Sequence, residues 1–166
     1  MSENIILVGM MGSGKSSVGR VLQNILKNQY THFDTDLYIQ RKEQKTIEHI
    51  FSEKGEDYFR KQENELLSEI PTSKTVLSTG GGLPFYLNNW ELLNQLGTVF
   101  FLSHPFGQLL SNIEKSSLKR PLFDQKTFKK LYEQRVVLYS KAQFTINCKG
   151  KHQTQIAKEI ISIMSR

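Results

Sequence analysis

The sequence predicts an α/β fold in which a mostly parallel sheet carries helices on both of its faces. Short apolar runs alternate with amphipathic helical patterns along the chain, and this alternation is typical of parallel sheets. The 166 residues suffice for one domain with a sizeable core, and 38% hydrophobic and 23% charged residues are near the globular average. This composition excludes collagen-like, coiled-coil and wholly disordered chains.

Five segments have the composition of buried strands, because they are short and rich in β-branched and aromatic residues. They are, in chain order, Ile5–Val8, Thr31–Phe33, Thr75–Leu77, Val99–Leu102 and Phe144–Ile146, the second of which is the least apolar. In a parallel sheet of this kind, ligands bind beyond the carboxyl ends of the strands.

Apolar residues recur at helical spacing in three stretches outside these runs. The stretches are Val18, Val21, Leu22, Ile25 and Leu26, then Phe59, Leu66, Leu67 and Ile70, and finally Ile156, Ile160, Ile161 and Met164. By contrast, Ser111–Gln125 is polar and shows little periodicity. We therefore predict a mobile loop over that segment.

Several classes of protein are excluded by what the sequence lacks. No apolar run approaches the ~18–20 residues of a membrane span, and the first residues lack the basic cluster and long apolar stretch of a signal peptide. The single cysteine, Cys148, excludes an internal disulfide and a Cys-based zinc cluster. These features predict a soluble protein of the reducing cytoplasm.

The chain is basic, with 22 Lys and Arg against 16 Asp and Glu and a net charge of +6. Gln108–Lys141 holds eight of the basic residues and three of the acids. Such a segment is either a solvated basic surface or a binding site for anions. Since the RNP, zinc-finger and basic-zipper signatures are absent, a small phosphorylated ligand is favoured over nucleic acid.

The junction between the first strand and the first helix carries the clearest chemical signal. Gly9–Ser16 reads GMMGSGKS and matches G-x-x-x-x-G-K-[ST], the P-loop, in the strand–loop–helix setting that it requires. Its glycines let backbone N–H groups surround a phosphate chain, and the helix N-terminus adds positive potential. Lys15 can reach the β- and γ-phosphates and Ser16 can ligate Mg²⁺. The setting disfavours the alternative, a plain glycine-rich turn.

Four further features bear on the second substrate. They are Asp34-Thr35-Asp36 at the predicted end of the second strand, Arg60 with Glu63 on one face of a helix after Gly55, Gly80-Gly81-Gly82 after the third strand, and Arg120-Pro121 with Arg135. Taken singly, each has an ordinary alternative: a helix cap, a surface ion pair, a plain loop and exposed arginines. In a regular strand Asp34 and Asp36 would point to the same side. The carboxylate of Asp34 can face a metal and that of Asp36 a substrate hydroxyl only if the strand ends at about Asp34.

Together these motifs resemble the shikimate kinases over nearly the whole chain. The matching segments are GMMGSGKSS, DTD, IEHIF, GEDYFRKQE, STGGG, KRPLF and Glu133-Gln134-Arg135. The resemblance implies a P-loop three-layer sandwich with a five-stranded parallel sheet and one domain over residues 1–166. It also implies a substrate-binding segment at about 34–63 and a mobile lid at about 111–125. The implied reaction transfers the ATP γ-phosphate to the 3-hydroxyl of shikimate, in chorismate biosynthesis.

The resemblance also assigns roles to individual residues. The ATP-binding residues would be Gly12, Ser13, Gly14, Lys15, Ser16, Ser17, Arg120 and Gln153. The shikimate-binding residues would be Asp36, Arg60, Glu63, Gly80, Gly81, Gly82 and Arg135. Lys15, Asp36 and Arg120 would be catalytic, and Ser16 and Asp34 would hold Mg²⁺, the latter through water. The expected partners are shikimate and ATP, without nucleic acid or membrane, and the expected state is a monomer.

The chain departs from the family at Ile113. Many shikimate kinases have at this position, seven residues before RPL, an arginine that stacks on adenine, so the nucleotide preference stays open. A second stretch that contacts adenine would fall around Lys149–Gln153.

Three other functions are compatible with parts of the sequence. The first is another small-molecule kinase on the same scaffold, for gluconate or a nucleoside monophosphate, which the triple glycine and the arginine pair disfavour. The second is a non-catalytic P-loop switch, which the presence of Asp36 and Arg120 disfavours. The third is a nucleic-acid binder, which a steep salt dependence of binding to random DNA would support.

Overall fold

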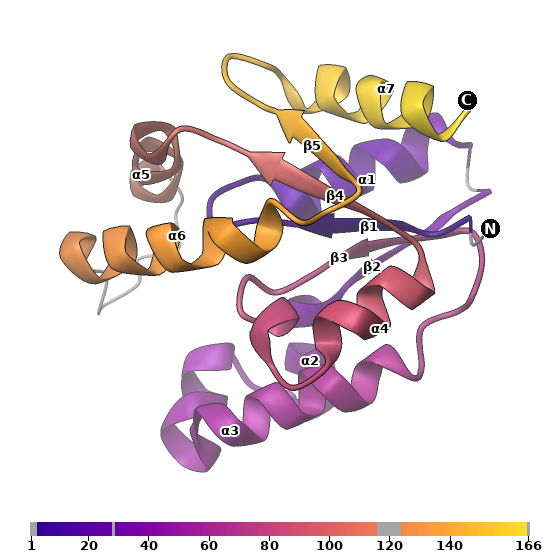
Figure 1. Ribbon diagram of the computed structural model, residues 1–166. Coiled ribbons are helices and arrows are strands. Elements are labelled where there is room, and N and C mark those ends of the chain that lie inside the picture. The colour runs from indigo at the N-terminus through magenta and orange to yellow at the C-terminus, as the bar shows by residue number, and fades with distance from the viewer. Residues whose placement is uncertain (1–2, 28, 116–123, 166) are drawn as a thin grey trace.

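The computed structural model describes residues 3–27, 29–115 and 124–165. Within these ranges five parallel strands form one sheet in the order β2-β3-β1-β4-β5 (Figure 1). The strands are β1 (Ile5–Val8), β2 (Thr31–Asp34), β3 (Thr75–Ser78), β4 (Thr98–Ser103) and β5 (Phe144–Asn147). Each agrees with its predicted range to within one residue at either end.

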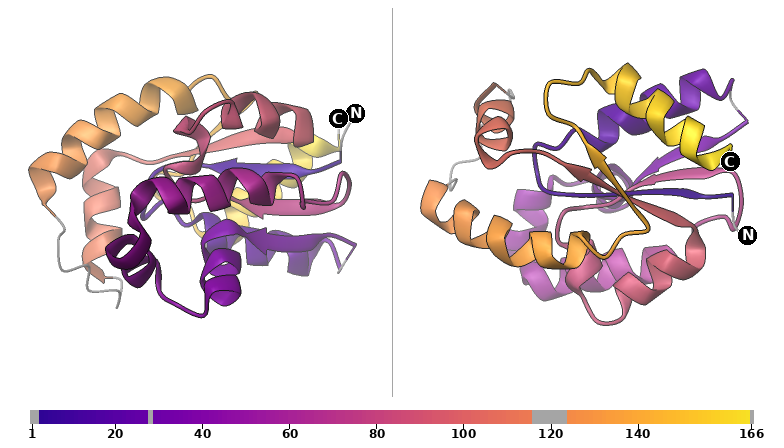
Figure 2. Two further views of the ribbon diagram at one scale, coloured as in Figure 1. Left: turned by 90° about the horizontal axis from the view of Figure 1, so that it is seen from below. Right: turned by 45° about the horizontal axis from the view of Figure 1, so that its top comes forward.

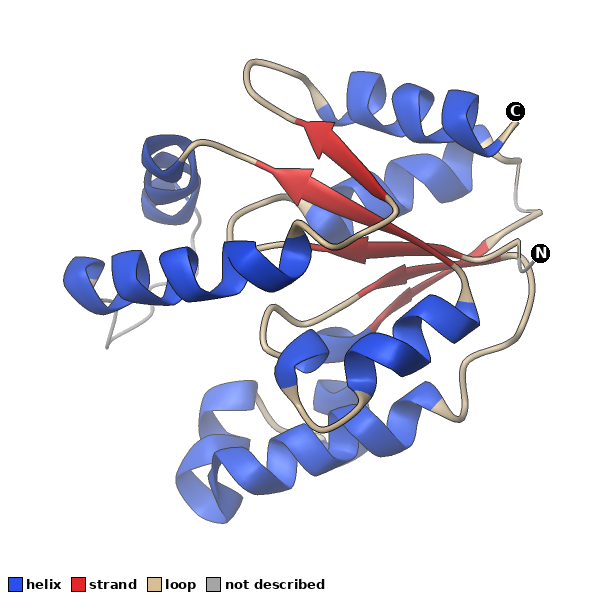
Figure 3. Cartoon of the chain, viewed as in Figure 1, coloured by secondary structure: helices blue, strands red, loops and turns tan. Residues whose placement is uncertain are grey.

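Helices cover both faces of this sheet (Figure 3). Those in the described ranges are α1 (Lys15–Ile25), α2 (Thr35–Glu43), α3 (Ile47–Leu67), the 3-10 helix η1 (Leu83–Phe85), α4 (Asn89–Leu96), α5 (Phe106–Lys115), α6 (Gln125–Tyr139) and α7 (Gln153–Met164). Helices α1 and α7 lie side by side on one face, and α3 and α4 lie on the other (Figures 1 and 2). The predicted three-layer α/β sandwich is confirmed. None of the described helices is long and apolar enough to cross a membrane.

Strand β1 shows why its sequence is continuously apolar. Ile6 and Val8 pack in the core beneath α3, α4 and α6, whereas Ile5 and Leu7 pack in the core beneath α1 and α7. Successive side chains of a strand point to opposite faces, so a strand with helices on both sides needs apolar residues at every position. All four residues are at most 1% exposed.

Helix α3 is interrupted at Gly55, where the sequence predicted a break. Gly55 has φ 80° and ψ 168°, outside the helical region, in a conformation that favours glycine. The helical stretch after it carries Arg60 and Glu63. The helix ends at Leu67, before Ile70 of the predicted pattern, although Ile70 is buried from the loop that follows.

The loop predicted over Ser111–Gln125 is wrong in its first part. Residues 111–115 are helical and complete α5, because Leu109 and Ile113, four residues apart, both bury their side chains in the core. At the other end, Asp124 caps α6 by accepting from the backbone N–H of Thr127 at 2.8 Å. Residues 116–123 of the predicted lid, with Arg120 and Pro121, lie outside the described ranges.

Candidate active site

The P-loop follows β1 and ends in the first turn of α1. Gly12 and Gly14 have φ of 82° and 81°, a region in which a side chain would be strained. Gly14 is the N-cap of α1, so the unpaired N–H groups of the first helical turn face the loop. The ammonium of Lys15 donates to the carbonyls of Gly9 and Met10 at 2.8 and 2.9 Å. This arrangement gathers backbone donors and a cation at one helix N-terminus, as an anion site requires.

Two side chains that the motifs did not indicate hold the P-loop from outside. His104 Nε2 lies 3.1 Å from the carbonyl oxygen of Ser13, and Asn112 Nδ2 donates to the carbonyl of Gly12 at 2.9 Å. Because C=O and the following N–H point in opposite directions across a trans peptide, the first bond turns the N–H of Gly14 away from His104. Burial lowers the pKa of His104, so the neutral ring with a protonated Nε2 makes this bond.

Ile113 lies against the P-loop rather than at its open side. A Cβ placed on Gly12 would lie 2.9 Å from Ile113 Cγ1, and Ile113 is only 9% exposed. The apolar side chain of Ile113 therefore packs against the P-loop. Ile113 follows Asn112 on α5, and both side chains approach Gly12 of the P-loop.

Strand β2 ends at Asp34. This is the strand end that the sequence required for Asp34 and Asp36 to point in different directions. The carboxylate of Asp34 accepts from the hydroxyl of Ser16, and its Oδ1 accepts from the N–H of Leu37 at 3.1 Å as the cap of α2. The helix-cap interpretation is therefore correct, but the same carboxylate also reaches the P-loop. A hydroxyl and a carboxylate side by side suit Mg²⁺, which binds hard oxygen ligands, keeps several waters and takes its other ligands from phosphates.

The first glycine of the triple-glycine loop after β3 is surrounded by acidic side chains. A Cβ on Gly80 would lie 2.5 Å from both Asp36 Oδ1 and Glu63 Oε1, so no larger residue fits. The N–H of Gly80 donates to Thr35 Oγ1 at 2.8 Å. This bond, which the sequence did not indicate, attaches the loop to the start of α2. Asp36 and Glu63, from α2 and α3, thus meet at one glycine.

Arginines surround the other two glycines of this loop. A Cβ on Gly82 would lie 2.5 Å from Arg60 Cζ, and one on Gly81 would lie 3.2 Å from Arg135 Nη1. Arg60 comes from α3 and Arg135 from α6, 75 residues later in the chain. These arginine side chains approach the backbone so closely that a residue with a Cβ would collide with them. The triple glycine is therefore not an ordinary loop sequence, which was the alternative interpretation.

Arg60 and Glu63 form a buried pair rather than the surface pair that was the alternative. Arg60 Nη1 donates to Glu63 Oε2 at 2.5 Å, and Nη2 donates to Glu56 Oε1 at 2.9 Å. The Glu63 side chain is fully buried, and its Oε1 has no hydrogen-bond partner among the described residues. Burial raises the pKa of Glu63 to about 7, although the charge of Arg60 opposes the rise.

The remaining predicted residues occupy less informative places. Ser17 lies in the first turn of α1, half-buried, and Gln153 begins α7 with an exposed side chain. The contact of Gln153 with adenine stays a prediction. Arg120 lies outside the described residues, so its position on the lid and its catalytic role stay predictions as well.

Comparison with known proteins decides the family. A family model described as shikimate kinase matches residues 11–165. The chain belongs to the shikimate kinase family. It is 40% identical over 159 residues to a shikimate kinase of Clostridium botulinum (strain 657 / Type Ba4), covering 93% of this chain and 92% of the relative. A shikimate kinase of Sulfurihydrogenibium sp. (strain YO3AOP1) is 39% identical over 167 residues, 99% of each chain.

The solved structures agree with this assignment to the shikimate kinases. Shikimate kinase from Acinetobacter baumannii, solved in complex with shikimate, superposes with a TM-score of 0.90 at 33% identity, covering 99% of this chain and 94% of that one. This member of the shikimate kinase family is therefore an ATP-dependent kinase. The kinase activity that the resemblance implied is confirmed.

The buried carboxyl of Glu63 gives a pH prediction. Its pKa rises from an ordinary 4.5 to about 7 on folding, so the fold favours the protonated form. Its contribution to the free energy of unfolding is complete below pH 4.5 and is lost as the pH rises through about 7. In Glu63→Gln, which cannot ionise, the free energy of unfolding should fall less between pH 5 and pH 8, measured by urea denaturation.

A matched control separates this effect from the general titration of the protein. Glu65, two residues farther along α3, has a 47% exposed side chain, and Glu65→Gln should retain the pH dependence of the parent. An unchanged pH dependence in Glu63→Gln would contradict the assignment of the raised pKa to this residue.

Proposed function

We propose that this enzyme transfers the γ-phosphoryl group of ATP to the 3-hydroxyl of shikimate, giving shikimate 3-phosphate and ADP in chorismate biosynthesis. The observation that carries the proposal is the meeting of a carboxylate and two arginines at the triple glycine, directly beside the P-loop. A Cβ on Gly81 would lie 3.7 Å from both the carbonyl of Gly9 and the N–H of Met11. The two loops are thus in contact, as direct transfer between their ligands requires. The shikimate complex of the A. baumannii relative supports this assignment.

The arginines supply the recognition of a carboxylate in this proposal. The planar guanidinium of Arg60 or Arg135 can donate two parallel hydrogen bonds to a carboxylate, which gives both strength and orientation. Glu63 and Glu56 hold Arg60 in place. The backbone of Gly80, Gly81 and Gly82 leaves room for a ring to lie against the loop, because no Cβ projects from it.

Phosphoryl transfer depends mainly on positioning and electrostatics, and the site contains the groups that this requires. The N–H groups of the P-loop and the Lys15 ammonium would bind the phosphates, and Ser16 and Asp34 would hold Mg²⁺. When bound, Mg²⁺ would neutralise charge on the phosphates and orient them. Asp36, at Gly80, would accept a hydrogen bond from the attacking hydroxyl and take its proton.

The untested sequence predictions belong to the same proposal. They are one domain over residues 1–166, a substrate-binding segment at about 34–63 and a lid at about 111–125 that brings Arg120 to the phosphoryl group. The partners would be shikimate and ATP alone, in a monomeric, cytoplasmic enzyme that binds neither nucleic acid nor membrane. The contact of Ile113 with Gly12 supports a nucleotide site in which apolar packing replaces an arginine.

A coupled assay of ADP release tests the proposed substrate. With Mg·ATP, shikimate should support turnover, and gluconate and nucleoside monophosphates should not. Comparable rates with gluconate would place the enzyme in the rival class of small-molecule kinases. Binding to random DNA should be weak at physiological ionic strength.

Arg60→Ala tests the binding of the carboxylate. A charge-assisted hydrogen-bond pair is worth ~1.5–3 kcal/mol, so the Kd for shikimate should rise about tenfold to a hundredfold, measured by calorimetry, with ATP affinity nearly unchanged. Arg60→Lys should restore little, because an ammonium cannot form two parallel bonds.

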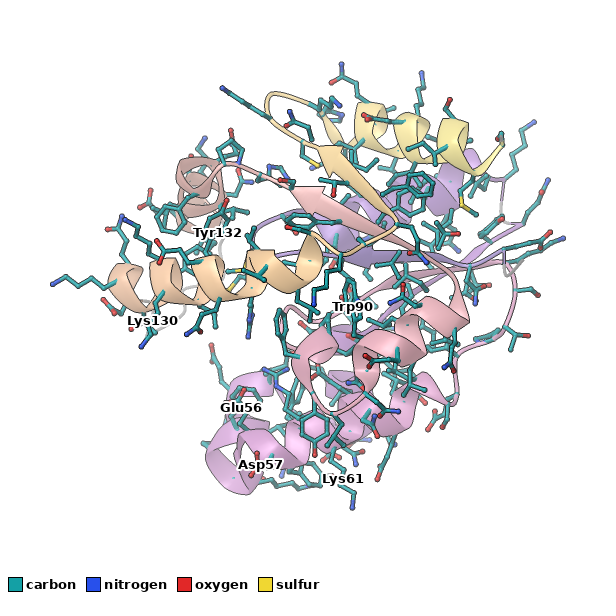
Figure 4. All side chains as sticks on the ribbon, viewed as in Figure 1. Glu56, Asp57, Lys61, Trp90, Lys130 and Tyr132 are labelled. Atoms are coloured by element: carbon teal, nitrogen blue, oxygen red, sulfur yellow. The ribbon has the colours of Figure 1, made fainter. Side chains whose placement is uncertain are left out.

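The neighbouring residue provides the control for this variant. Lys61, whose side chain is 68% exposed on the outer side of α3 (Figure 4), should be replaceable by alanine without change in either affinity. An equal loss of ATP and shikimate affinity in Arg60→Ala would show that Arg60 supports the whole site rather than one carboxylate.

A further inference from the structure

Arg135 is a half-buried cation on which the charges of Glu56 and Glu63 act without forming a direct ion pair. None of the ion pairs formed among the described residues includes it, and burial, followed by the nearby charge of Arg60, lowers its pKa. Arg60, by contrast, is paired with two glutamates. A guanidinium without a direct ion-pair partner can still bind an anionic ligand, but it needs neutral neighbours that satisfy its N–H groups and fix its plane.

Tyr139, one turn after Arg135 on α6, is such a neighbour. Its side chain is fully buried, and its hydroxyl donates to the carbonyl of Gly81 at 2.5 Å. The charge of Arg135 acts on this tyrosine, and Arg135 Nη1 approaches the same glycine, since a Cβ on Gly81 would lie 3.2 Å from it. Burial raises the pKa of Tyr139, so the hydroxyl keeps its proton at neutral pH. A neutral hydroxyl and the arginine therefore meet at the same glycine of the loop.

Phe85, at the end of η1, provides the second neutral contact. Its ring centroid lies 5.4 Å from Arg135 Cζ, within the range of a cation–π interaction. The same ring meets Tyr139 edge to face, with centroids 5.4 Å apart and planes at 75°. The guanidinium thus lies over a ring and beside Gly81, to which the Tyr139 hydroxyl is bonded, and none of these groups carries charge.

We propose that Tyr139 and Phe85 are positioning residues of the shikimate site, which hold the Arg135 guanidinium against Gly81 without reducing its charge. The inference rests on the proposed function, in which Arg135 binds the substrate carboxylate. The bond from Tyr139 to Gly81 has a second effect, because a fixed carbonyl turns the N–H of Gly82 to the opposite side of the peptide. The Tyr139 hydroxyl would thereby fix both the position of the Arg135 guanidinium and the orientation of the Gly81–Gly82 peptide.

Tyr139→Phe is the direct test, because it removes the hydroxyl and keeps the ring that packs on Phe85 and Phe101. Loss of the hydrogen bond to Gly81 should raise the KM for shikimate about three- to tenfold, while kcat and the KM for ATP change less than about twofold. Phe85→Leu, at a half-exposed position, should raise the same KM in the same direction. A purely structural role would instead raise both KM values and lower the melting temperature without this selectivity.

Tyr132→Phe is the matched control. Tyr132 lies about two turns earlier on the same helix, where it contacts Phe106 on the side toward α5 (Figure 4). Removal of the Tyr132 hydroxyl should leave the KM for shikimate and the KM for ATP unchanged.

Arg135→Ala distinguishes failure of this inference from failure of the proposed function. If Arg135→Ala raises the shikimate KM and neither Tyr139→Phe nor Phe85→Leu does, the positioning role is wrong and the carboxylate assignment stands. If none of the three changes that KM, Arg135 does not bind the carboxylate and the proposed function loses one of its two arginines. In the Arg135→Ala background, Tyr139→Phe should have no further effect on the shikimate KM; a full further rise would show that Tyr139 acts independently of Arg135.

Discussion

Replacing Lys15 by alanine is expected to lower turnover by about two to three orders of magnitude, the range seen when one preorganised charge at a reacting centre is removed. Lys15 is 9% exposed, and its ammonium lies within the P-loop, bonded to the carbonyls of Gly9 and Met10. A cation in this position would bind the charged oxygens of the phosphate chain as they accumulate charge in the transition state. The alanine variant keeps the glycines and the α1 N-terminus but loses this charge.

The measurement separates chemistry from folding and from binding of the second substrate. ADP release should fall by the stated factor, whereas thermal unfolding and calorimetric binding of shikimate should stay close to those of the parent. Lys158→Ala, at an exposed position on α7, removes an equal charge and should leave turnover unchanged. Retention of more than about a tenth of the parent activity in Lys15→Ala would contradict the assigned role.

The strands could be predicted from the sequence, but their order could not. Each strand is a short apolar run whose burial on both faces follows from composition alone. The position of β3 between β1 and β2 depends on pairing between segments more than 40 residues apart, which local patterns do not record. The helical residues 111–115 were missed because Leu109 and Ile113 give only one helical repeat, too little to distinguish a short helix from a loop.

The site shows the same division between local and long-range information. The i, i+3 spacing of Arg60 and Glu63 predicted that they share a face, and the structure places them in contact. The residues that were missed act across the chain: Tyr139 bonds to Gly81, 58 residues away, and His104 bonds to Ser13, 91 residues away. Neither lies in a motif, and a single aromatic or histidine in a helix or loop is ordinary until its partner is known.

Asp36→Asn is expected to abolish most of the turnover, by about two to four orders of magnitude, while Mg·ATP binding persists. The two aspartates of the DTD motif have different surroundings, because β2 ends at Asp34 and Asp36 lies in the first turn of α2. Asp36 Oδ1 lies beside the first glycine of the triple-glycine loop, because a Cβ on Gly80 would be 2.5 Å from it. Asparagine keeps the size of the side chain and loses the negative charge that would orient the hydroxyl and accept its proton.

Asp34→Asn is the matched variant, because it makes the same chemical change two residues away. Asp34 is bonded to the Ser16 hydroxyl and caps α2, and asparagine is an equally good cap, so the helix should survive. The Mg²⁺ concentration for half-maximal rate should rise, since one anionic oxygen near the proposed metal ligand Ser16 is lost. Measured as rate against Mg²⁺ at saturating ATP and shikimate, Asp36→Asn should keep the midpoint of the parent at a much lower maximum. Interchanged results, with Asp36 setting the Mg²⁺ midpoint, would reverse the two roles, because the residue that controls the metal requirement must be the one beside the metal.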